Sequence, residues 1–315
     1  DALHGDRFRK DSRCFDFINN VSYDTSVEGG QCVLTATAGQ RKAKVTAQFA
    51  FGSGSRGVTY VGSYLQQPVE LRISHYSRAG RQGRWEFTPG QPLGARPQTP
   101  VGRVLGIEDQ KECFLCHSTA LVMDQTGVDT DHSILGIGCE TCHGPGRAHV
   151  EAVRRKDPEL HIPRLSRMRE QLSTRLCGQC HRNPESKDAD QPITLAQLPR
   201  FQGLALSKSA CFRKSAGRLS CVTCHDPHRN AATITRAEYN GKCVSCHTPH
   251  RADQVACKVS TGGDCVSCHM PAQTVDLPTR PSFNTHWIKV WRKNGKDGKD
   301  GKAEALRAAL QSAAG

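Results

Sequence analysis

Most of the 16 cysteines fall into one short pattern, Cys-x-x-Cys-His, which occurs six times. Two thiols at this spacing can add to the two vinyl groups of a porphyrin, while the histidine that follows binds the iron. The sequence therefore predicts six covalently bound haem c groups. The predicted attachment cysteines are Cys113, Cys116, Cys139, Cys142, Cys177, Cys180, Cys221, Cys224, Cys243, Cys246, Cys265 and Cys268. The predicted proximal iron ligands are His117, His143, His181, His225, His247 and His269.

Other chemistries use a Cys-x-x-Cys pair as well. A single pair fits half of a zinc site or a thioredoxin-like redox pair. A zinc site, however, would combine two such pairs to obtain four ligands, and it does not require a histidine after each pair. A disulfide framework requires no histidine at all. Six repeats of the full pattern therefore favour haem attachment.

The spacing of the motifs bears on their function. All six lie between residues 113 and 269, which leaves about 26 residues for each haem. So little polypeptide cannot wrap each macrocycle separately, so neighbouring haems must pack close together and form a path for electrons. The last three motifs begin at Cys221, Cys243 and Cys265, a repeat of 22 residues that indicates three copies of one helix-and-loop unit.

The second axial ligand of each iron must come from another side chain. The chain has 14 histidines but only three methionines, so we expect mainly bis-His coordination and low potentials. The predicted distal ligands are His228, His250, His149, His286, His132 and His75. His161 competes with His75 for the sixth place, and His4 is expected to bind no haem.

His228 and His250 have the strongest case. Each lies three residues after a proximal histidine and directly after a proline, on the same side of that haem. Neither can reach the opposite face of the same iron, so each must bind a different haem and fix the two haems relative to each other. The alternative is a surface histidine after a proline turn.

The arguments for the other candidates are weaker. His149 follows a Gly-Pro-Gly turn that can bring it back toward a neighbouring haem. His286 follows the last motif and could close the end of the haem array, and His132 precedes the second motif. A lone histidine is more often a hydrogen-bonded surface or core residue than a ligand.

Composition limits the fold and the partners. Hydrophobic residues make up 37% of the chain, and 29 glycines and 16 prolines interrupt it, so side chains alone would build a thin core. No apolar run reaches the roughly 18 residues of a membrane span, so no integral membrane segment is expected. The net charge of +13 is spread along the chain, and about twelve haem propionates would offset much of it. Nucleic acid is therefore not an expected partner.

Three segments are expected. Residues 1–100 contain no haem motif, and short runs rich in Val, Thr, Phe and Tyr at 31–37, 43–51, 57–61 and 69–76 predict a small N-terminal antiparallel β-domain. A Pro- and Gly-rich linker at 89–100 should lead into residues 101–290, a mostly irregular and α-helical, haem-packed multihaem cytochrome domain. Residues 291–315 are expected to form a flexible tail with a short helix.

Four cysteines lie outside the motifs. Cys14 and Cys32 fall in the β-rich segment, where a disulfide that closes the intervening loop is expected, with two buried thiols as the alternative. Cys211 and Cys257 could form a second disulfide, although sequence does not give the distance between them.

Three stretches carry a family resemblance: 112–119 (ECFLCHST), 138–146 (GCETCHGPG) and 221–228 (CVTCHDPH). They resemble bacterial multihaem c-type cytochromes of the group related to the tetrahaem cytochromes of ammonia oxidation, the pentahaem nitrite reductases and the octahaem hydroxylamine oxidoreductases. The resemblance spans about residues 105–290 and is specific for haem attachment and stacking. In that group the last histidine of Cys-His-x-Pro-His commonly binds a neighbouring haem, which implies the same for His228 and His250.

Two departures from this group count against an enzyme. The nitrite reductases place a lysine where the catalytic haem would have its proximal histidine, and none of the six motifs does so. The last tyrosine is Tyr239, so none follows the haem region to form the crosslink of the hydroxylamine-oxidising type. Enzyme activity would require an iron with an open distal position.

The leading hypothesis is a periplasmic or extracellular electron carrier with closely stacked, mostly bis-His haems. Its expected partners are redox proteins, including copies of itself. The start at Asp1 without a methionine is what an exported, processed chain would show. Two alternatives stay open: a subunit of an extracellular conducting filament, and a multihaem oxidoreductase acting on a small nitrogen or sulfur compound.

Overall fold

The computed structural model describes residues 5–8, 13–52, 57–78, 81–164, 170–181, 201–247, 263–274 and 282–291. The chain divides into two compact units. The first comprises Asp1–His181 with Thr274–Phe283, and the second comprises Arg182–Gln273 with Asn284–Gly315. The first three Cys-x-x-Cys-His motifs therefore belong to the first unit and the last three to the second.

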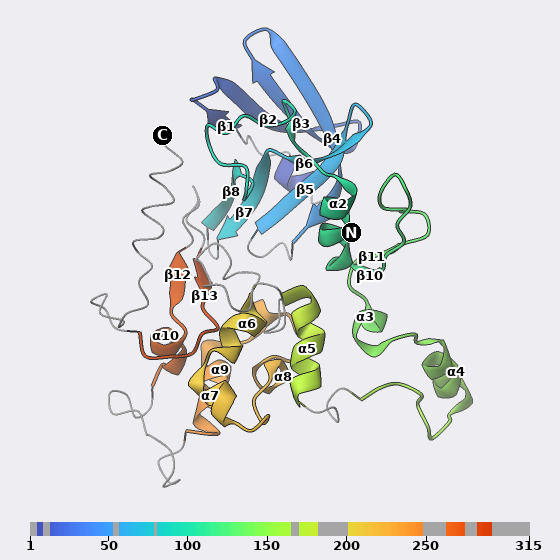
Figure 1. Ribbon diagram of the computed structural model, residues 1–315, viewed down its shortest axis with the longest axis vertical. Coiled ribbons are helices and arrows are strands. Elements are labelled where there is room, and N and C mark those ends of the chain that lie inside the picture. Colours follow the sequence, from blue (N-terminus) through green and yellow to red (C-terminus); the bar gives the residue numbers. More distant parts are fainter. Residues whose placement is uncertain are drawn as a thin grey trace. The chain divides into compact units, whose positions relative to one another are not determined.

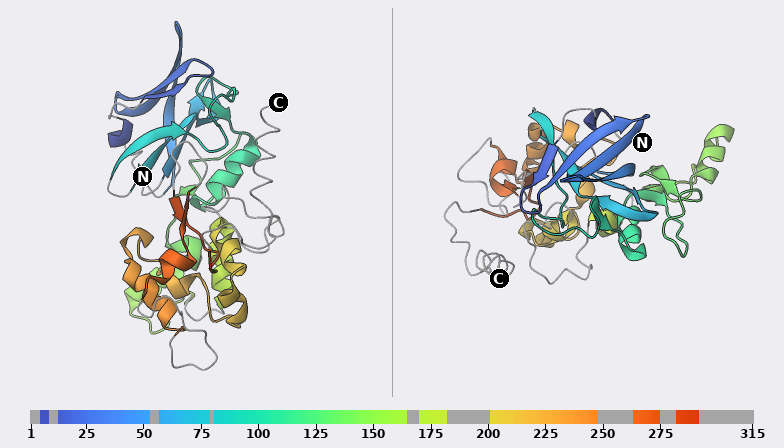
Figure 2. Two further views of the ribbon diagram at one scale, coloured as in Figure 1. Left: turned by 90° about the vertical axis from the view of Figure 1, so that its left-hand side faces the viewer. Right: turned by 90° about the horizontal axis from the view of Figure 1, so that it is seen from above.

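An antiparallel sheet forms the N-terminal part of the first unit, after a short helix α1 (Gly5–Phe8) (Figures 1 and 2). Its strands in the described ranges are β1 (Arg13–Asp16), β2 (Val21–Glu28), β3 (Gln31–Ala38), β4 (Arg41–Phe51), β5 (Gly57–Tyr64), β6 (Gln67–Leu71), β7 (Ile73–Arg78), β8 (Arg81–Phe87) and β9 (Gly102–Val104). The strand order is β1-β2-β3-β4-β5-β6-β9, and β7 pairs with both β5 and β8.

Alternation of apolar and polar residues explains these strands. On β3, Cys32, Leu34 and Ala36 are buried, whereas Thr35 and Thr37 are less so, as expected of a sheet with one face on a core. Tyr60 packs against Phe8 and Trp85 on that face, with ring centroids 4.9 and 5.4 Å away. The three predicted runs at 31–37, 43–51 and 57–61 fall within β3, β4 and β5, and the run at 69–76 covers the end of β6 and the start of β7.

The segment expected to be a linker is held against this sheet. The fully buried guanidinium of Arg72 donates hydrogen bonds to the carbonyl oxygens of Gln91, Pro92 and Ala95, at 2.8 to 3.0 Å. Arg72 also forms a fully buried ion pair with Asp16, at 3.1 Å. Because β9 then pairs with β6, the sheet extends beyond residue 100.

The strand register contradicts the expected disulfide between Cys14 and Cys32. Cys14 on β1 lies opposite Tyr23 on β2, which lies opposite Ala36 on β3, four residues beyond Cys32. With strands about 4.8 Å apart and a rise of about 3.3 Å per residue, the two Cα atoms are roughly 16 Å apart, far beyond the ~7 Å limit for a disulfide. The expectation was wrong because β2 separates the two cysteines, and Cys14 is a buried thiol.

The rest of the first unit consists of short elements around the first three motifs. They are α2 (Ile107–Leu115), β10 (Ser118–Ala120), β11 (Ile134–Leu135), α3 (Cys139–His143), α4 (Arg147–Arg155) and α5 (Glu170–His181). Strands β10 and β11 form a small antiparallel pair between the first and second motifs.

The described part of the second unit contains short helices and few buried apolar residues. Its described elements are α6 (Gln202–Ser207), α7 (Ala210–Lys214), α8 (Cys221–Cys224), a 3-10 helix (Ala231–Thr233), α9 (Arg236–Val244) and α10 (Cys265–His269), and strands β12 (Ala272–Thr274) and β13 (Ser282–Asn284) lie at its boundary. The motif-bearing helices α8, α9 and α10 bury none of their residues. Side chains alone thus leave these helices largely uncovered. Within the described ranges, the structure has no apolar helix of membrane-spanning length.

Candidate haem-attachment sites

The first motif is anchored to the sheet through aromatic side chains. Phe114, next to the motif's first cysteine, packs edge-to-face on Phe49 and Phe51 of β4, with ring centroids 5.0 Å apart in each case. The ring of His117 also lies edge-on to Phe51, at 5.0 Å. The orientation of the first proximal histidine therefore depends on the sheet.

Charged residues hold the other end of α2. Arg103 on β9 bridges Glu70 on β6, at 3.2 Å, and Asp109 in the first turn of α2, at 2.9 Å. Asp109 in turn accepts a hydrogen bond from the backbone N–H of Gly106 at the start of the helix. These contacts fix where α2 begins, and hence where Cys113 and Cys116 lie at its end.

Thr119 connects the first motif to the second. Its hydroxyl donates to the carbonyl of Gly136, at 2.8 Å, and accepts from the backbone N–H of Gly138, at 2.8 Å. Gly138 precedes α3, which carries the second motif. A residue of β10 is thereby joined to two residues just before α3, so the two motifs are held close within the first unit.

The Gly-Pro-Gly turn after the second motif leads directly into α4. Gly144 has a φ of +70°, a conformation that favours glycine, and the Glu140 carboxylate accepts a 2.6 Å hydrogen bond from the backbone N–H of Gly146. This turn places His149, in the first turn of α4, near α3.

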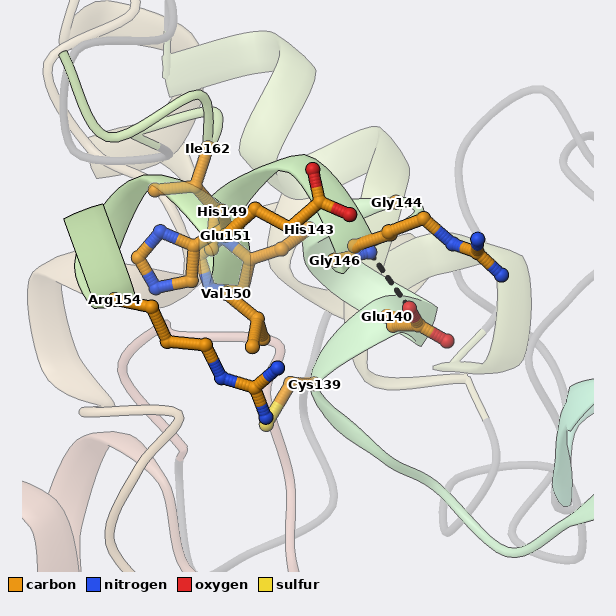
Figure 3. A pocket seen from close by; sticks show the side chains of 11 residues that line it. Cys139, Glu140, His143, Gly144, Gly146, His149, Val150, Glu151, Arg154 and Ile162 are labelled. Atoms are coloured by element: carbon orange, nitrogen blue, oxygen red, sulfur yellow. Dashed lines mark hydrogen bonds between the residues drawn. The ribbon is translucent and has the colours of Figure 1, made fainter. Parts of the chain in front are cut away.

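A cavity of about 600 Å³ lies between α3 and α4 (Figure 3). Cys139 and His143 of the second motif line it, together with His149 and Arg154 of α4. An attachment cysteine, a proximal histidine and a predicted distal histidine thus face one space. Arginine is suited to pair with the propionates of a porphyrin there.

Both cavity histidines are oriented by backbone carbonyl groups. Nδ1 of His143 lies 3.0 Å from the carbonyl oxygen of Pro163, and Nδ1 of His149 lies 2.7 Å from that of Leu160. Since a carbonyl oxygen can only accept, Nδ1 donates in each case, and in the neutral ring this leaves the lone pair on Nε2. An iron-binding histidine typically has this second hydrogen bond, so both residues fit haem ligation.

The same arrangement occurs in the second unit at the sixth motif. Nδ1 of His269 donates to the carbonyl oxygen of Lys289, at 3.1 Å. At the fourth motif, Nδ1 of His225 lies 3.2 Å from the hydroxyl of Tyr239. The donor sets at these motifs therefore fit a cofactor that needs two thiols and one imidazole Nε2.

Cysteines of the first three motifs gather at one place in the first unit. The thiols of Cys116 and Cys180 form a hydrogen bond, and Cys142 lies near enough to act on Cys180 electrostatically. The hydrogen bond, burial and the neighbouring thiols together raise the pKa of Cys180 well above that of an ordinary thiol. The Cys116 sulfur also lies 3.8 Å from the carbonyl oxygen of Gln179.

Cysteines of the last three motifs gather in the same way in the second unit. Burial, with smaller contributions from Cys265 and Cys224, raises the pKa of Cys243 to about 11. Arg236 and Asn240 join α9 to the next motif: Arg236 pairs with Asp264 at 2.8 Å, and the Asn240 side chain accepts from the backbone N–H of Val266 at 3.1 Å. The fourth, fifth and sixth motifs thus form a second cluster.

Cys211 lies at this second cluster. It acts electrostatically on Cys224 and Cys243. Burial raises the pKa of the Cys211 thiol, and Cys246 adds to this rise, while backbone hydrogen bonds oppose it. Its predicted partner Cys257 lies outside the described residues, so that disulfide stays a prediction.

One predicted distal ligand lies opposite a proximal one. The rings of His225 and His286 have centroids 6.1 Å apart, and their planes are inclined by 29°. His286 follows β13, far along the chain from the fourth motif.

The other predicted distal ligands occupy varied positions. His228 is exposed and its Nδ1 lies 3.3 Å from an Asp226 carboxylate oxygen, and exposed His132 pairs with Asp129 at 2.7 Å. His75 is buried on β7, edge-on to Trp85, and His161 is exposed with a φ of +45°. For these residues, haem ligation stays a prediction. His250 and His4 lie outside the described residues.

Several positioning groups had no signal in the sequence. The carbonyl groups of Pro163, Leu160 and Lys289 belong to the backbone, which every residue shares. Tyr239 lies four residues before Cys243 and attracts attention only because its hydroxyl reaches another motif's histidine. Phe49 and Phe51 were predicted as strand residues, and their contact with α2 follows from tertiary packing alone.

A comparison with protein families matches residues 98–144 to the family described as cytochrome c554 and c-prime. This segment runs from the residues before β9 to the end of the second motif. The match supports a c-type cytochrome that binds haem c covalently and transfers electrons. No curated protein and no solved structure matches the chain.

Proposed function

We propose that this chain is an exported electron carrier of the periplasm or cell exterior, with six haem c groups arranged as two sets of three. The observation that carries the proposal is the gathering of attachment cysteines within each unit. Cys180 of the third motif contacts Cys116 of the first and lies near Cys142 of the second. Porphyrins attached through these sulfurs would lie next to one another.

A bound haem supplies an iron centre that gains and loses one electron without making or breaking covalent bonds. The task of the polypeptide is then to hold the centres close, exclude alternative ligands and set their potentials. The hydrogen bonds from Nδ1 of His143, His149 and His269 to carbonyl oxygens make Nε2 a stronger donor, which favours oxidised iron and a low potential.

The basic side chains have a role in this proposal. Arg147 and Arg154 line the cavity beside Cys139 and His143, where they can neutralise propionates. Across the chain, the net charge of +13 balances much of the roughly twelve negative charges that six haems would bring.

Counting haems tests the proposal. The chain is produced with an export signal in a bacterium that attaches haem c, and its mass is measured after denaturation. Six added haem masses are expected, and fewer would contradict the proposal. The double variant Cys139→Ala/Cys142→Ala should lose one haem, whereas Cys211→Ala, outside the motifs, should lose none.

Two further measurements separate this proposal from its alternatives. Electron paramagnetic resonance should show only low-spin iron, as expected of bis-His haems. A high-spin, five-coordinate signal would instead favour an oxidoreductase with an open iron. Electron microscopy of the purified protein should show discrete particles, and filaments would favour a conducting assembly.

A further inference from the structure

We propose that His286 is the second axial ligand of the iron whose haem is attached at Cys221 and Cys224, opposite His225. The inference rests on the proposed haem attachment and goes beyond it by assigning one ligand pair. Sequence alone made His286 a candidate ligand without indicating its haem.

The separation of the two rings is the first argument. With metal–nitrogen bonds of about 2.0–2.1 Å and a ring nitrogen about 1.1 Å from its centroid, two imidazoles on opposite sides of one metal ion have centroids about 6.2 Å apart. The observed separation is 6.1 Å. The two ring planes are inclined by only 29°, and a separation of 6.1 Å leaves room for one iron between the two imidazoles.

The orientation of His225 is the second argument. In the tautomer that binds iron through Nε2, its Nδ1–H donates to the hydroxyl of Tyr239, 3.2 Å away on α9. The Tyr239 ring also lies edge-on to the imidazole, with centroids 5.4 Å apart. Two contacts from one side chain therefore hold the proximal ring in one orientation.

The backbone around His286 is fixed independently of any haem. The hydroxyl of Ser209 donates to the carbonyl oxygen of His286, at 3.2 Å, and accepts from the backbone N–H of Ile288, at 2.8 Å. Buried Thr285 donates its N–H to the carbonyl oxygen of Pro271, at 3.2 Å. The position of His286 is therefore determined by contacts within the second unit, as a preformed ligand site requires.

The segment that carries His286 also orients the proximal ligand of the sixth motif. Lys289, three residues on, accepts the hydrogen bond from Nδ1 of His269, at 3.1 Å. Trp291 donates its indole N–H to the carbonyl oxygen of His269, at 3.2 Å. One short segment thus serves the fourth haem as a ligand and the sixth haem as an orienting group, so the two sites are mechanically linked.

The His286→Gly variant tests the assignment through spin state and not through activity. We expect the same number of haems by mass as in wild type, one haem fewer in the low-spin signal, and one new high-spin haem. Added imidazole should replace the missing ligand and restore the low-spin signal. The matched control Val290→Thr changes an exposed residue of the same segment and should leave both signals unchanged. A His286→Gly spectrum identical to wild type would overturn the assignment.

A double variant identifies the haem. In a Cys221→Ala/Cys224→Ala background, which lacks the fourth haem, His286→Gly should create no additional high-spin iron. Loss of another low-spin haem in that background would show that His286 binds a different iron and would overturn the pairing. If wild type itself lacks haem at the fourth motif, haem attachment there has failed, which mass spectrometry distinguishes from failure of the ligand assignment.

A second substitution keeps a side chain that can bind iron at position 286, so that its effect does not depend on an empty site. His286→Met should keep the fourth iron low-spin but raise the potential of one haem, because thioether ligation favours reduced iron. A redox titration in which all potentials equal those of wild type would overturn the assignment.

Discussion

Phe114 packs edge-to-face on Phe51, with ring centroids 5.0 Å apart, and Phe51 makes the same kind of contact with His117. A sheet strand therefore positions both the helix of the first motif and its proximal histidine. Phe114 is 3% exposed, and it lies between the two cysteines of the first motif. The sheet is the support on which the first haem site is built.

We predict that Phe114→Ala destabilises the first unit by about 3–5 kcal/mol, because it removes a buried ring and leaves a cavity. Guanidinium denaturation followed by circular dichroism of the sheet measures the change. Phe17→Ala is the matched control, because Phe17 is 68% exposed and its removal should have little effect. Equal effects of the two substitutions would contradict the proposed anchoring role.

The thiol of Cys14 should resist alkylation in the native protein. Burial, followed by the negative charge of Glu86, raises its pKa to about 12 from an ordinary value of 9.0. Its thiolate fraction at pH 8 is then roughly a thousandfold below that of an exposed cysteine. Peptide mapping after iodoacetamide treatment measures the modification.

Denaturation without a reductant should make Cys14 fully reactive, since the strand register separates it from Cys32. Exposed thiols in a denatured chain alkylate readily, so the Cys14 peptide should then carry the label. A peptide that is labelled only after reduction would show that the cysteine was in a disulfide, contrary to the structure.

The ion pair of Asp16 and Arg72 should make the stability of the first unit fall in acid. Burial alone would raise the pKa of Asp16, but hydrogen bonds from Asn19, Arg72 and Gly94 together lower it. A lowered folded-state pKa contributes stability above the unfolded value of about 3.9, and this contribution is lost as the pH falls through the folded value. Denaturation midpoints measured between neutral and acid pH test this.

Asp16→Asn should remove that acid dependence and destabilise the unit at neutral pH by about 3 kcal/mol, because it leaves the buried Arg72 charge uncompensated. Glu28→Gln, which breaks the exposed pair with Lys44, is the control and should change stability little. If the Asp16→Asn protein were as stable as wild type at neutral pH, the carbonyl groups around Arg72 would be sufficient to stabilise its buried charge.

Local patterns in the sequence could predict the parts of this molecule that depend on local chemistry. The Cys-x-x-Cys-His spacing is set by the two vinyl groups of one porphyrin, so the candidate attachment residues could be identified without a structure. The runs that form β3, β4 and β5 could be identified because each strand buries one face and is therefore rich in β-branched and aromatic residues.

Contacts between distant segments could not be predicted in this way. The disulfide expected for Cys14 and Cys32 failed because loop length does not reveal that β2 passes between them. Residues 89–100, predicted to be a linker, are held by Arg72. A charged residue such as Arg72 is not expected from sequence to be fully buried. The division of the motifs into two groups of three, and the approach of His286 to His225, depend on how separate segments pack.

The hydroxyl of Tyr239 accepts a hydrogen bond from Nδ1 of His225 when Nε2 binds iron. This hydrogen bond makes the imidazole a stronger donor and stabilises oxidised iron more than reduced iron. Tyr239→Phe should therefore raise the potential of one haem by roughly 20–65 mV, which corresponds to a hydrogen bond worth about 0.5–1.5 kcal/mol. Spectroelectrochemical titration measures the shift. Tyr64→Phe, in the sheet of the first unit, should leave every potential unchanged, and a Tyr239→Phe protein with wild-type potentials would show that the hydroxyl does not tune this iron.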